Sequence, residues 1–510
     1  MKITLKRVIY LILILSIISI ISLTGLIFTS CDSAKSGDTI TPTNQTPDQT
    51  PAEDEPVAPP EFVPVDGIDY GGYNFRILGF DGAARGTWQA TMISEIIAEE
   101  EIGEPIHDAV YRRNREVEAL YNVAFGIVPV TYPNRGDFAT KFTKAVLAGD
   151  DLFDAAFLLG DGLPATLNRN NMVFDLLTIP SLNFSKSWWD QNSVKSLSIN
   201  GKLNAVMGDM NFYSALAPIV IFANKQIMQD YSIDNLYQLV REGKWTWDTL
   251  YDVAKTTTKD LNGDGKIDKN DQVGLFTQNV YLYAAINSAG ELMTPKNNDD
   301  TPELAPNIDR VSAITSKVVT ILKDASVAVV GDTITGFNNP YFDFIMPKFR
   351  DGEIMFLTQQ LIISFELRSM DADFSILPLP KYDESQANYG AQVANAWATY
   401  TVIPATCTDT ERTGNILEAM GYYSQKYIMP AYFDVTVTNK LMRDDDSLEM
   451  MDIIFGNRVF DLANLYNWGD VNGMLANITN SGKPDTFVSQ FEKNEAKINN
   501  ALQKVLDELE

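Results

Sequence analysis

Acidic and amide side chains alternate with other residues over residues 260–271, which read Asp-Leu-Asn-Gly-Asp-Gly-Lys-Ile-Asp-Lys-Asn-Asp. Calcium takes six to eight oxygen ligands, and a 12-residue loop that offers oxygens at alternate positions can surround one ion. Gly265 falls where such a loop must turn sharply, which favours a residue without a Cβ. The ligands that this spacing predicts are Asp260, Asn262, Asp264, Lys266 through its backbone carbonyl, Asp268 and Asp271. We therefore predict a structural calcium site, with a turn that binds no ion as the alternative.

The amino-acid composition leaves little room for catalysis by histidine or for zinc binding by several histidines. His107 is the only histidine of the chain, and it lies in Pro105-Ile-His-Asp-Ala-Val, which is typical of the start of a helix. Ser-His-Asp and Cys-His catalysis would require His107 itself as the base, and zinc sites with several histidines are impossible. We expect His107 to be a first-turn surface or core-edge residue.

The N-terminus has the features of an export signal. Lys2, Lys6 and Arg7 precede an apolar run over residues 8–28, and Thr-Ser then leads into Cys31. A charged start, an apolar core and small residues before a cleavage point define such a signal. Phe-Thr-Ser-Cys resembles a bacterial lipobox, so we predict a lipoprotein signal peptide at 1–30 and lipidation of Cys31. An uncleaved membrane anchor is the alternative, because the run is long enough to span a bilayer. Either way, the body of the protein is predicted on the outer face of the cytoplasmic membrane.

Residues 31–65 read as a disordered tether, because they are rich in Thr, Pro, Asp, Glu and Gln and cannot bury much apolar surface. The rest is long enough for two domains. A net charge of −27 argues against binding nucleic acid through a basic face. Cys31 and Cys407 are the only cysteines, so lipidation of Cys31 would leave no disulfide.

Strand-like and helix-like segments alternate after the tether. Residues 73–80, 123–130 and 153–159 read as strands, and residues 105–121 and 137–148 as amphipathic helices between them. Strand, helix, strand, helix, strand with short loops indicates a parallel α/β sheet. Further strands are predicted around 201–208, 217–225, 374–380 and 396–404. Residues 349–357 read as a helix end, a Gly stop and a buried strand, and residues 487–509 as a long amphipathic helix.

Several of these segments resemble the family 1 extracellular solute-binding proteins of bacterial ABC importers. Residues 218–225, Pro-Ile-Val-Ile-Phe-Ala-Asn-Lys, resemble the strand of that family that ends in Tyr-Asn-Lys, and residues 243–250 resemble its Trp-Thr-Trp helix start. Many members continue with a calcium-type loop and a Gly-Leu pair, here Gly274-Leu275. Residues 349–355, 376–381 and 397–404 resemble later segments of the family in the same order.

The resemblance implies a two-lobed, periplasmic-binding-protein-like II α/β fold whose lobes are discontinuous in sequence. We expect lobe 1 to contain residues 66–216 and 331–374, and lobe 2 to contain residues 217–330 and 375–510, with crossings near Ala217 and Phe374. It also implies a monomeric, non-enzymatic protein that captures a carbohydrate, an oligosaccharide, in the cleft and passes it to the importer's permease subunits.

The residues expected to contact ligand follow from sugar chemistry. Aromatic rings stack on the apolar faces of sugars, acidic and amide groups hold their hydroxyls, and side chains at strand ends line the crevice. Asp161 and Asp209 each follow a predicted strand, Trp397 follows the polar run 392–395, and Trp468 lies in a loop-like setting. For the tryptophans core packing is the alternative, and for the aspartates a turn or helix cap.

Two rival functions remain open at this stage. A secreted, calcium-stabilised glycoside hydrolase would also be acidic and rich in aromatic residues, and would need only two carboxylates. A surface-adhesion lipoprotein would fit the tether and the calcium loop, although it would usually show repeats and β-sandwich patterning.

Overall fold

The computed structural model describes residues 62–82, 94–130, 135–167, 172–367, 370, 372–438 and 445–509. All of them belong to one unit of the chain, residues 59–510. The predicted signal peptide, Cys31 and residues 31–61 of the predicted tether lie outside the described residues. Within the described ranges, no helix combines the length and the apolar character needed to cross a bilayer.

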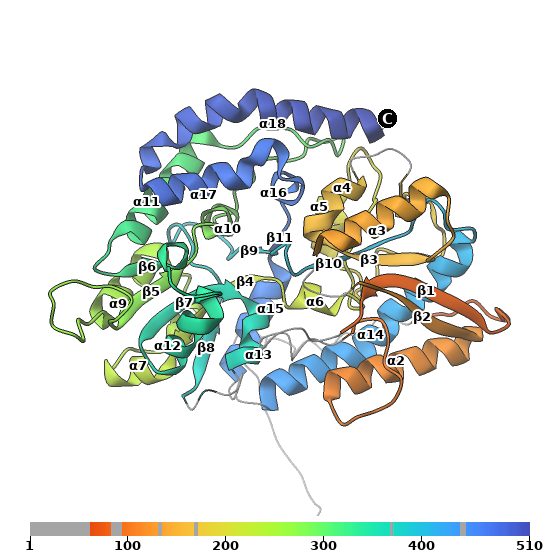
Figure 1. The fold of residues 1–510 in the computed structure, drawn as a ribbon, viewed down its shortest axis with the longest axis horizontal. Coiled ribbons are helices and arrows are strands. Elements are labelled where there is room, and N and C mark those ends of the chain that lie inside the picture. The colour runs from red at the N-terminus through yellow and green to blue at the C-terminus, as the bar shows by residue number, and fades with distance from the viewer. Residues whose placement is uncertain are drawn as a thin grey trace, which may run out of the picture. The chain divides into compact units, whose positions relative to one another are not determined.

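A first sheet has the strand order β10-β3-β1-β2 (Figure 1). β1 (Tyr73–Phe80), β2 (Val123–Val130) and β3 (Ala155–Leu159) run parallel, whereas β10 (Thr399–Val402) is antiparallel to β3. The crossover helices are α2 (Pro105–Tyr121) and α3 (Arg135–Ala148), so the alternating sequence pattern is confirmed here. In Figure 1, α3 covers one face of this sheet, and α2 with α14 (Thr410–Thr438) covers the other. β3 is therefore buried at every position.

Helix α2 begins where the sequence signals predict. Pro105 occupies its first turn, and the Glu104 carboxylate accepts a hydrogen bond from the His107 amide at 2.7 Å. Asn122 ends the helix in the left-handed conformation, with φ of 50°. His107 is thus a first-turn residue of a structural helix, as expected.

A second sheet has the order β6-β5-β7-β4-β8. Its strands are β4 (Ile219–Asn224), β5 (Val273–Thr277), β6 (Ala328–Val330), β7 (Ile354–Gln360) and β8 (Phe374–Leu377). β4 is antiparallel to β7 and β8, while β5 is parallel to β6 and β7. A short pair of parallel strands, β9 (Ala391–Gln392) and β11 (Arg458–Val459), forms a separate two-stranded sheet.

The remaining helices complete two lobes. The first-lobe helices not yet given are α4 (Leu163–Leu167), α5 (Gln191–Leu197) and α6 (Phe212–Ala215). Around the second sheet and its extension lie α7 (Lys225–Asp230), α8 (Leu236–Arg241), α9 (Trp247–Thr257), α10 (Tyr281–Ser288), α11 (Ile308–Lys323), α12 (Met346–Arg350), α13 (Ser364–Leu367), α15 (Asp445–Gly456), α16 (Leu462–Tyr466), α17 (Val471–Ser481) and α18 (Phe487–Leu509). We call the first sheet with α2–α6 and α14 the first lobe, and the second sheet with the other helices and with β9 and β11 the second lobe.

Among the described residues, two extended segments connect the lobes, residues 216–219 and 392–399. They lie side by side, because the Ala394 amide donates to the Ala217 carbonyl at 3.0 Å and Pro218 forms an antiparallel bridge with Val393. α14 packs along α2 of the first lobe, whereas α15 packs against β8 of the second. The lobes are therefore discontinuous in sequence.

The lobe boundaries differ from those expected from the sequence. Residues 331–374, expected in lobe 1, include β7, which pairs with β4 in the second sheet. Residues 399–438, expected in lobe 2, form β10 and α14 of the first lobe. The second crossing thus lies at 392–399 and not near Phe374. The hydrophobic pattern identifies such segments as strands, but their pairing partners depend on register and tertiary contacts that a period of two does not encode.

The end of the predicted tether packs against the first lobe. The ring of Phe62 stacks on Tyr422 of α14 with the ring centroids 4.9 Å apart, and its edge meets Trp188 at 6.2 Å. Offset-stacked and edge-to-face contacts of this kind add to the stability gained by burying the ring. Residues 62–65 therefore belong with the folded body rather than with the tether.

Candidate functional site

A cleft of about 210 Å³ opens between the two lobes at the connecting segments. Its lining comes from the carboxyl end of β3, from both connecting segments, and from α10, β7, α16 and α17 of the second lobe. The residues are Asp161, Ile219, Val280, Tyr281, Tyr283, Gln360, Gln392, Val393, Ala394, Asn395, Ala396, Asn464 and Asn472. In open α/β sheets, ligands bind beyond the carboxyl ends of strands, which is where Asp161 lies.

A glycine next to Asp161 brings the first lobe and the connecting segment together. The Gly160 amide donates to the Ala398 carbonyl at 3.0 Å, and a Cβ at position 160 would lie 2.9 Å from the Asn395 Cα. Any larger residue would push the segment away, since real Cβ contacts are not this short. Gly160 thus sets Asp161, whose side chain is exposed, beside Asn395.

One wall of the cleft is a chain of hydrogen-bonded amides. The Asn395 Nδ2 donates to the Asn464 Oδ1 at 3.0 Å, and the Asn464 Nδ2 donates to the Asn472 Oδ1 at 3.0 Å. The Tyr400 hydroxyl donates to the Asn395 Oδ1 at 3.3 Å. All three asparagines are only partly buried, so each keeps polar atoms available to a ligand. The wall is therefore fixed in orientation before anything binds.

The opposite wall contains two tyrosines that remain neutral donors. The Tyr281 hydroxyl donates to the Gln359 Oε1, and the Tyr283 hydroxyl donates to the Asp461 Oδ2 at 2.9 Å. Burial raises the pKa of both phenols above their ordinary range. Gln360, next to Gln359, faces the cleft at the end of β7.

The cleft carries little charge. Among the described residues that line it, Asp161 is the only one with a charged side chain, and the other polar groups are amides and phenols. No lysine or arginine is present in that lining to balance a phosphate, sulfate or carboxylate. Neutral side chains that both donate and accept are suited to hydroxyl groups.

The four residues predicted to contact ligand do not come together. Asp161 lines the cleft. Asp209 lies partly buried in the first lobe, where the Gln425 Nε2 donates to it at 3.1 Å. Burial raises the pKa of Asp209 to about 7, although Arg458 and Gln425 act in the opposite sense. Trp397 and Trp468 are 8% and 2% exposed, and Trp468 stacks on Tyr466 at 5.1 Å, so both rings form part of the core.

Sequence reasoning missed most of the lining. The Gln392–Asn395 run was recognised as polar but only as the lead-in to Trp397, and it holds two of the lining amides. Asn464, Asn472 and Gln360 gave no signal, because isolated amides are common at helix ends and turns.

The predicted calcium loop lies between α9 and β5, away from the lining of the cleft. Gly263 and Gly265 have φ of 76° and 77°, the left-handed turns that such a loop needs. The Asp260 carboxylate accepts hydrogen bonds from the amides of Gly263 at 2.6 Å and Gly265 at 2.8 Å. The donor set consists of oxygens only, which suits calcium. Within the described ranges, however, no three His, Cys, Asp or Glu side chains converge as metal ligands, so calcium binding stays a prediction.

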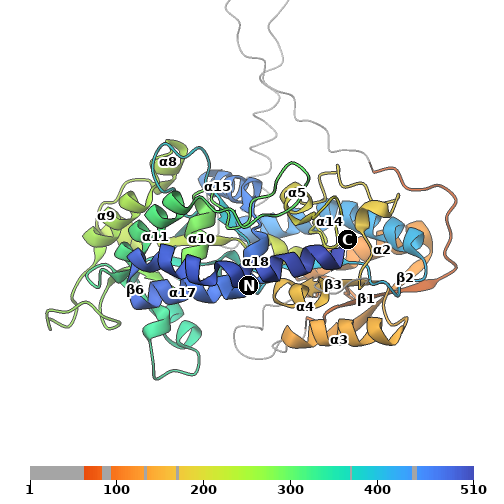
Figure 2. The same ribbon diagram turned by 90° about the horizontal axis from the view of Figure 1, so that it is seen from above.

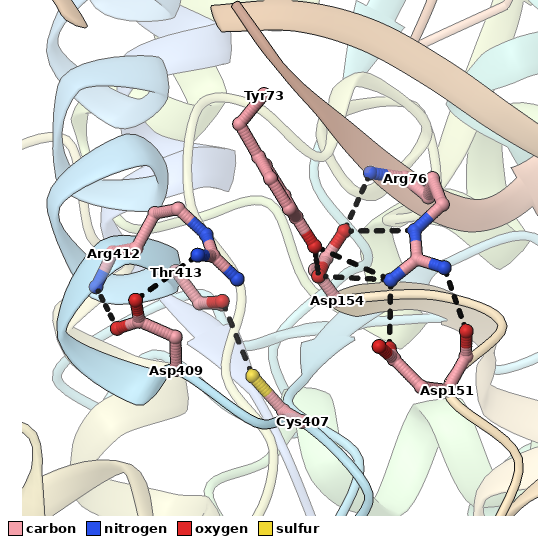
Figure 3. Close-up of polar contacts among 8 residues, drawn as sticks. All are labelled: Tyr73, Arg76, Asp151, Asp154, Cys407, Asp409, Arg412 and Thr413. Carbon is pink, nitrogen blue, oxygen red and sulfur yellow. Dashed lines mark hydrogen bonds and ion pairs between the residues drawn. The ribbon is translucent and has the colours of Figure 1, made fainter. Parts of the chain in front are cut away.

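A second concentration of charge lies at the amino ends of β1 and β3 (Figure 3). Arg76 pairs with Asp151 at 2.7 Å and Asp154 at 3.2 Å, and the Tyr73 hydroxyl donates to Asp154 at 2.7 Å. The Arg412 guanidinium lies 3.7 Å from the Tyr73 ring centroid. These contacts pair the charges with one another at the end of the sheet opposite Asp161, so we assign the cluster a structural role.

No protein-family model matches the chain, and no curated protein matches its sequence. Solved structures do match. A cyclic α-maltosyl-1,6-maltose binding protein from Arthrobacter globiformis matches with a TM-score of 0.54 and 12% identity, over 85% of this chain and 99% of that one. An ABC substrate-binding protein from Listeria monocytogenes, in complex with cycloalternan, matches with a TM-score of 0.53 and 13% identity, over the same shares. The GacH receptor of Streptomyces glaucescens, solved unliganded and with acarbose, matches with a TM-score of 0.53 and 12% identity, over 85% and 99%.

At these identities the likeness establishes the fold. The chain has the two-lobed, periplasmic-binding-protein-like α/β fold of these three structures, as its sequence segments indicate. By their descriptions, these three structures are binding proteins and a receptor.

Proposed function

We propose that this protein captures a neutral carbohydrate in the cleft between its lobes and delivers it to an ABC importer without altering it. The observation that carries the proposal is the lining of the cleft, which combines five amide side chains, two neutral phenols and one carboxylate. Its position at the carboxyl end of β3 and between the connecting segments is the place where this fold is suited to hold a ligand.

The lining matches the hydrogen-bonding pattern of a sugar. Each ring hydroxyl both donates and accepts, and an amide can meet both demands from one side chain. Asp161 can accept two hydroxyl donors, and charge-assisted hydrogen bonds of this kind are the stronger ones. Because the Asn395–Asn464–Asn472 wall is already ordered, binding would not require these side chains to be fixed anew.

The size of the cleft limits how much of an oligosaccharide it can enclose. About 210 Å³ is below the roughly 300–1,000 Å³ of pockets that hold drug-sized ligands. We infer that about one or two rings enter the cleft. Further rings would lie along the rim, where Val280 is 52% exposed. The aromatic side chains in the lining are buried, so hydrogen bonding rather than ring stacking would provide most of the specificity.

The remaining parts of the proposal concern where the protein acts. Permease subunits of an importer would be its partner, and lipid on Cys31 would hold it at the outer face of the cytoplasmic membrane. One calcium ion in the loop 260–271 would have a structural role, since the loop does not line the cleft. Hinge bending at residues 216–219 and 392–399 would close the lobes on the ligand, because the contacts that the ligand makes with both lobes at once form only when it is bound.

A glycan panel tests the proposal. Thermal shift and calorimetry with neutral mono-, di- and oligosaccharides, matched uronic acids and short peptides should show binding of a neutral sugar alone. Asp161→Asn should weaken that binding about tenfold or more, since it removes a charge-assisted acceptor. Asp150→Asn, which makes the same change on an exposed loop residue, should leave affinity unchanged.

Other results would overturn the proposal. Binding of peptides but not sugars would retain the fold and reject the ligand class. Steady release of reducing ends by the pure protein would favour a glycoside hydrolase, for which two carboxylates are the usual requirement. The described lining offers one, Asp161, which is why we favour binding over hydrolysis.

A further inference from the structure

Helix α5 of the first lobe is held at both ends by groups from the second lobe. At its amino end, Arg458 of β11 forms an ion pair with Asp190 at 2.7 Å, and the Asn192 Nδ2 donates to the Gly456 carbonyl at 3.1 Å. At its carboxyl end lies the segment between α10 and α11, residues 289–307, which we call the strap. In Figure 2 the strap, coloured green, runs from α10 toward α5 before the chain enters α11.

The base of the strap is fixed to the second lobe. The buried carboxylate of Asp461, just before α16, accepts hydrogen bonds from the Met293 amide at 2.7 Å and the Thr294 hydroxyl at 2.8 Å. It also accepts from the Tyr283 hydroxyl, and Tyr283 lines the ligand cleft. The strap is thus tied to the wall of the cleft through a single side chain.

The tip of the strap is a tight hairpin. The Asn297 amide donates to the Thr301 carbonyl at 2.9 Å, and the Asn297 Oδ1 accepts from the amides of Asp299 and Thr301. Asp300 adopts φ of 63°, a conformation that Asp and Asn tolerate better than most residues. This geometry turns the Asp300 carboxylate and the Lys296 ammonium toward the first lobe.

The tip makes a dense polar contact with residues 195–201. The Lys296 Nζ donates to the Ser198 carbonyl at 3.0 Å and the Ser198 Oγ at 2.9 Å, and it pairs with Asp300. The Asp300 Oδ1 accepts from the Ser198 Oγ at 3.0 Å, and its Oδ2 accepts from the Gly201 amide at 3.1 Å. The Asn200 amide donates to the Asp300 carbonyl at 3.0 Å, and the Thr301 hydroxyl donates to the Asn200 Oδ1 at 2.7 Å.

Partial burial and charge should make this contact persist in solution. Lys296 and Asp300 have side chains that are 17% and 29% exposed, so water competes only in part for their hydrogen bonds. Hydrogen bonds from Lys296, the Gly201 amide and Ser198 outweigh the effect of partial burial and lower the pKa of Asp300, which keeps it ionised. The partners on the first lobe, Asn200 and Gly201, form a turn with φ of 53° and 71° that presents their amides outward.

We propose that the strap is a latch between the lobes: Lys296 and Asp300 hold the carboxyl end of α5 and so restrain the hinge at residues 216–219 and 392–399. The latch acts together with Arg458, which holds the other end of α5. Lobe movement would then require the strap contact to slide or break. The proposal does not depend on the identity of the ligand, because the contact joins residues of this chain to one another.

Asp300→Asn and Asp299→Asn in the full chain test the latch. Both remove one negative charge from the same hairpin, but Asp299 is exposed and adjacent to the contact residue. Asparagine tolerates the backbone conformation at position 300. It has one acceptor oxygen instead of two, so it cannot accept from the Gly201 amide and from Ser198 and Lys296 at the same time. Amide hydrogen exchange over residues 198–202 should become roughly tenfold faster in Asp300→Asn, because charged hydrogen bonds are lost, and should stay unchanged in Asp299→Asn. Lys296→Met should reproduce the effect.

Solution scattering without ligand supplies the second readout. The distribution of radii of gyration should broaden in Asp300→Asn and Lys296→Met and not in Asp299→Asn, with circular dichroism spectra unchanged in all three. Equal exchange in all variants would mean that the strap is detached in solution and would overturn the proposal. Faster exchange with unaltered scattering would also overturn it, since the contact would then form without restraining the lobes.

Discussion

Glu95 offers a measurable link between the connecting segments and pH. Its buried carboxylate accepts hydrogen bonds from the Tyr213 amide at 2.6 Å, just before residues 216–219, and from the Thr399 hydroxyl at 2.9 Å, at the end of residues 392–399. Burial raises the pKa of Glu95 to about 8, against the opposing effects of these hydrogen bonds and of the buried Arg113. The side chain therefore holds a proton in the folded state at neutral pH.

The consequence for stability follows from proton linkage. In the unfolded chain Glu95 ionises near its ordinary value of 4.5, whereas in the folded protein it stays protonated up to about pH 8. Between these values the folded state binds the extra proton, so raising the pH favours unfolding by about 1.4 kcal/mol per pH unit. From pH 5.5 to pH 7 the contribution of Glu95 to the free energy of unfolding should thus fall by about 2 kcal/mol.

Glu95→Gln removes this dependence with little change in shape. The glutamine Oε1 can accept from the Tyr213 amide, and its amide nitrogen can donate to the Thr399 hydroxyl. Urea unfolding of the variant and the parent at pH 5.5, 6.3 and 7 should show the variant gaining about 2 kcal/mol relative to the parent across that range. Glu99→Gln, an exposed change four residues away, should follow the parent at every pH. Parallel pH profiles for Glu95→Gln and the parent would refute the reasoning and show that Glu95 is ionised, with Arg113 as its counterion.

Four further predictions concern the rest of the chain. Chelation of calcium should lower the melting temperature, because an ion that binds only the folded state stabilises it, and Asp264→Ala should abolish that sensitivity; an unchanged melting curve would reject the calcium site. Cys31→Ser should release or misprocess the protein, whereas a mature mass that retains Met1 would indicate an anchor. Trp468→Ala should reduce the free energy of unfolding by about 3–5 kcal/mol with sugar affinity unchanged, and lost affinity at full stability would contradict its core position. Arg76→Met should reduce the free energy of unfolding by about 3 kcal/mol, because Asp154 would be left buried with one less partner. An unchanged free energy of unfolding would show that the cluster does not contribute to stability.

Individual helices and strands could be predicted where the spacing of hydrophobic residues and the helix-capping residues indicated the same bounds. The strands at 73–80 and 123–130 and the helix at 105–121 have the expected bounds. Pro105 marks the helix start, and the spacing of apolar residues changes between the two-residue period of a strand and the 3.6-residue period of a helix. The stripe of α18 is likewise confirmed, with Phe487, Phe491 and Ile498 buried.

The assignment of strands to lobes was not predictable in the same way. β7 and β10 read as similar apolar strands, yet β7 pairs with β4 and β10 with β3. Pairing partners far apart in the chain depend on the whole fold, and short-range patterns carry no information about them.

The residues of the candidate site could also be predicted only in part from the sequence. Asp161 was found because a strand end is a general place for ligand contacts. Trp397 and Trp468 were chosen by residue type, but their environments decide their roles, and large aromatic rings are more often used for packing. The amides Asn395, Asn464 and Asn472 come from three separate segments and become a wall only when the fold brings those segments together.

The packing of Phe62 against Tyr422 and Trp188 has a mechanical consequence. It places the upstream end of the described chain on α14, so any pull transmitted through the preceding residues is borne by the first lobe. From the first lobe, such a pull reaches the second lobe through routes that include residues 216–219 and 392–399 and the strap contact. If Cys31 carries lipid and the protein acts as proposed, the first lobe would be the half attached to the membrane, and the second lobe would move relative to it when ligand binds and leaves.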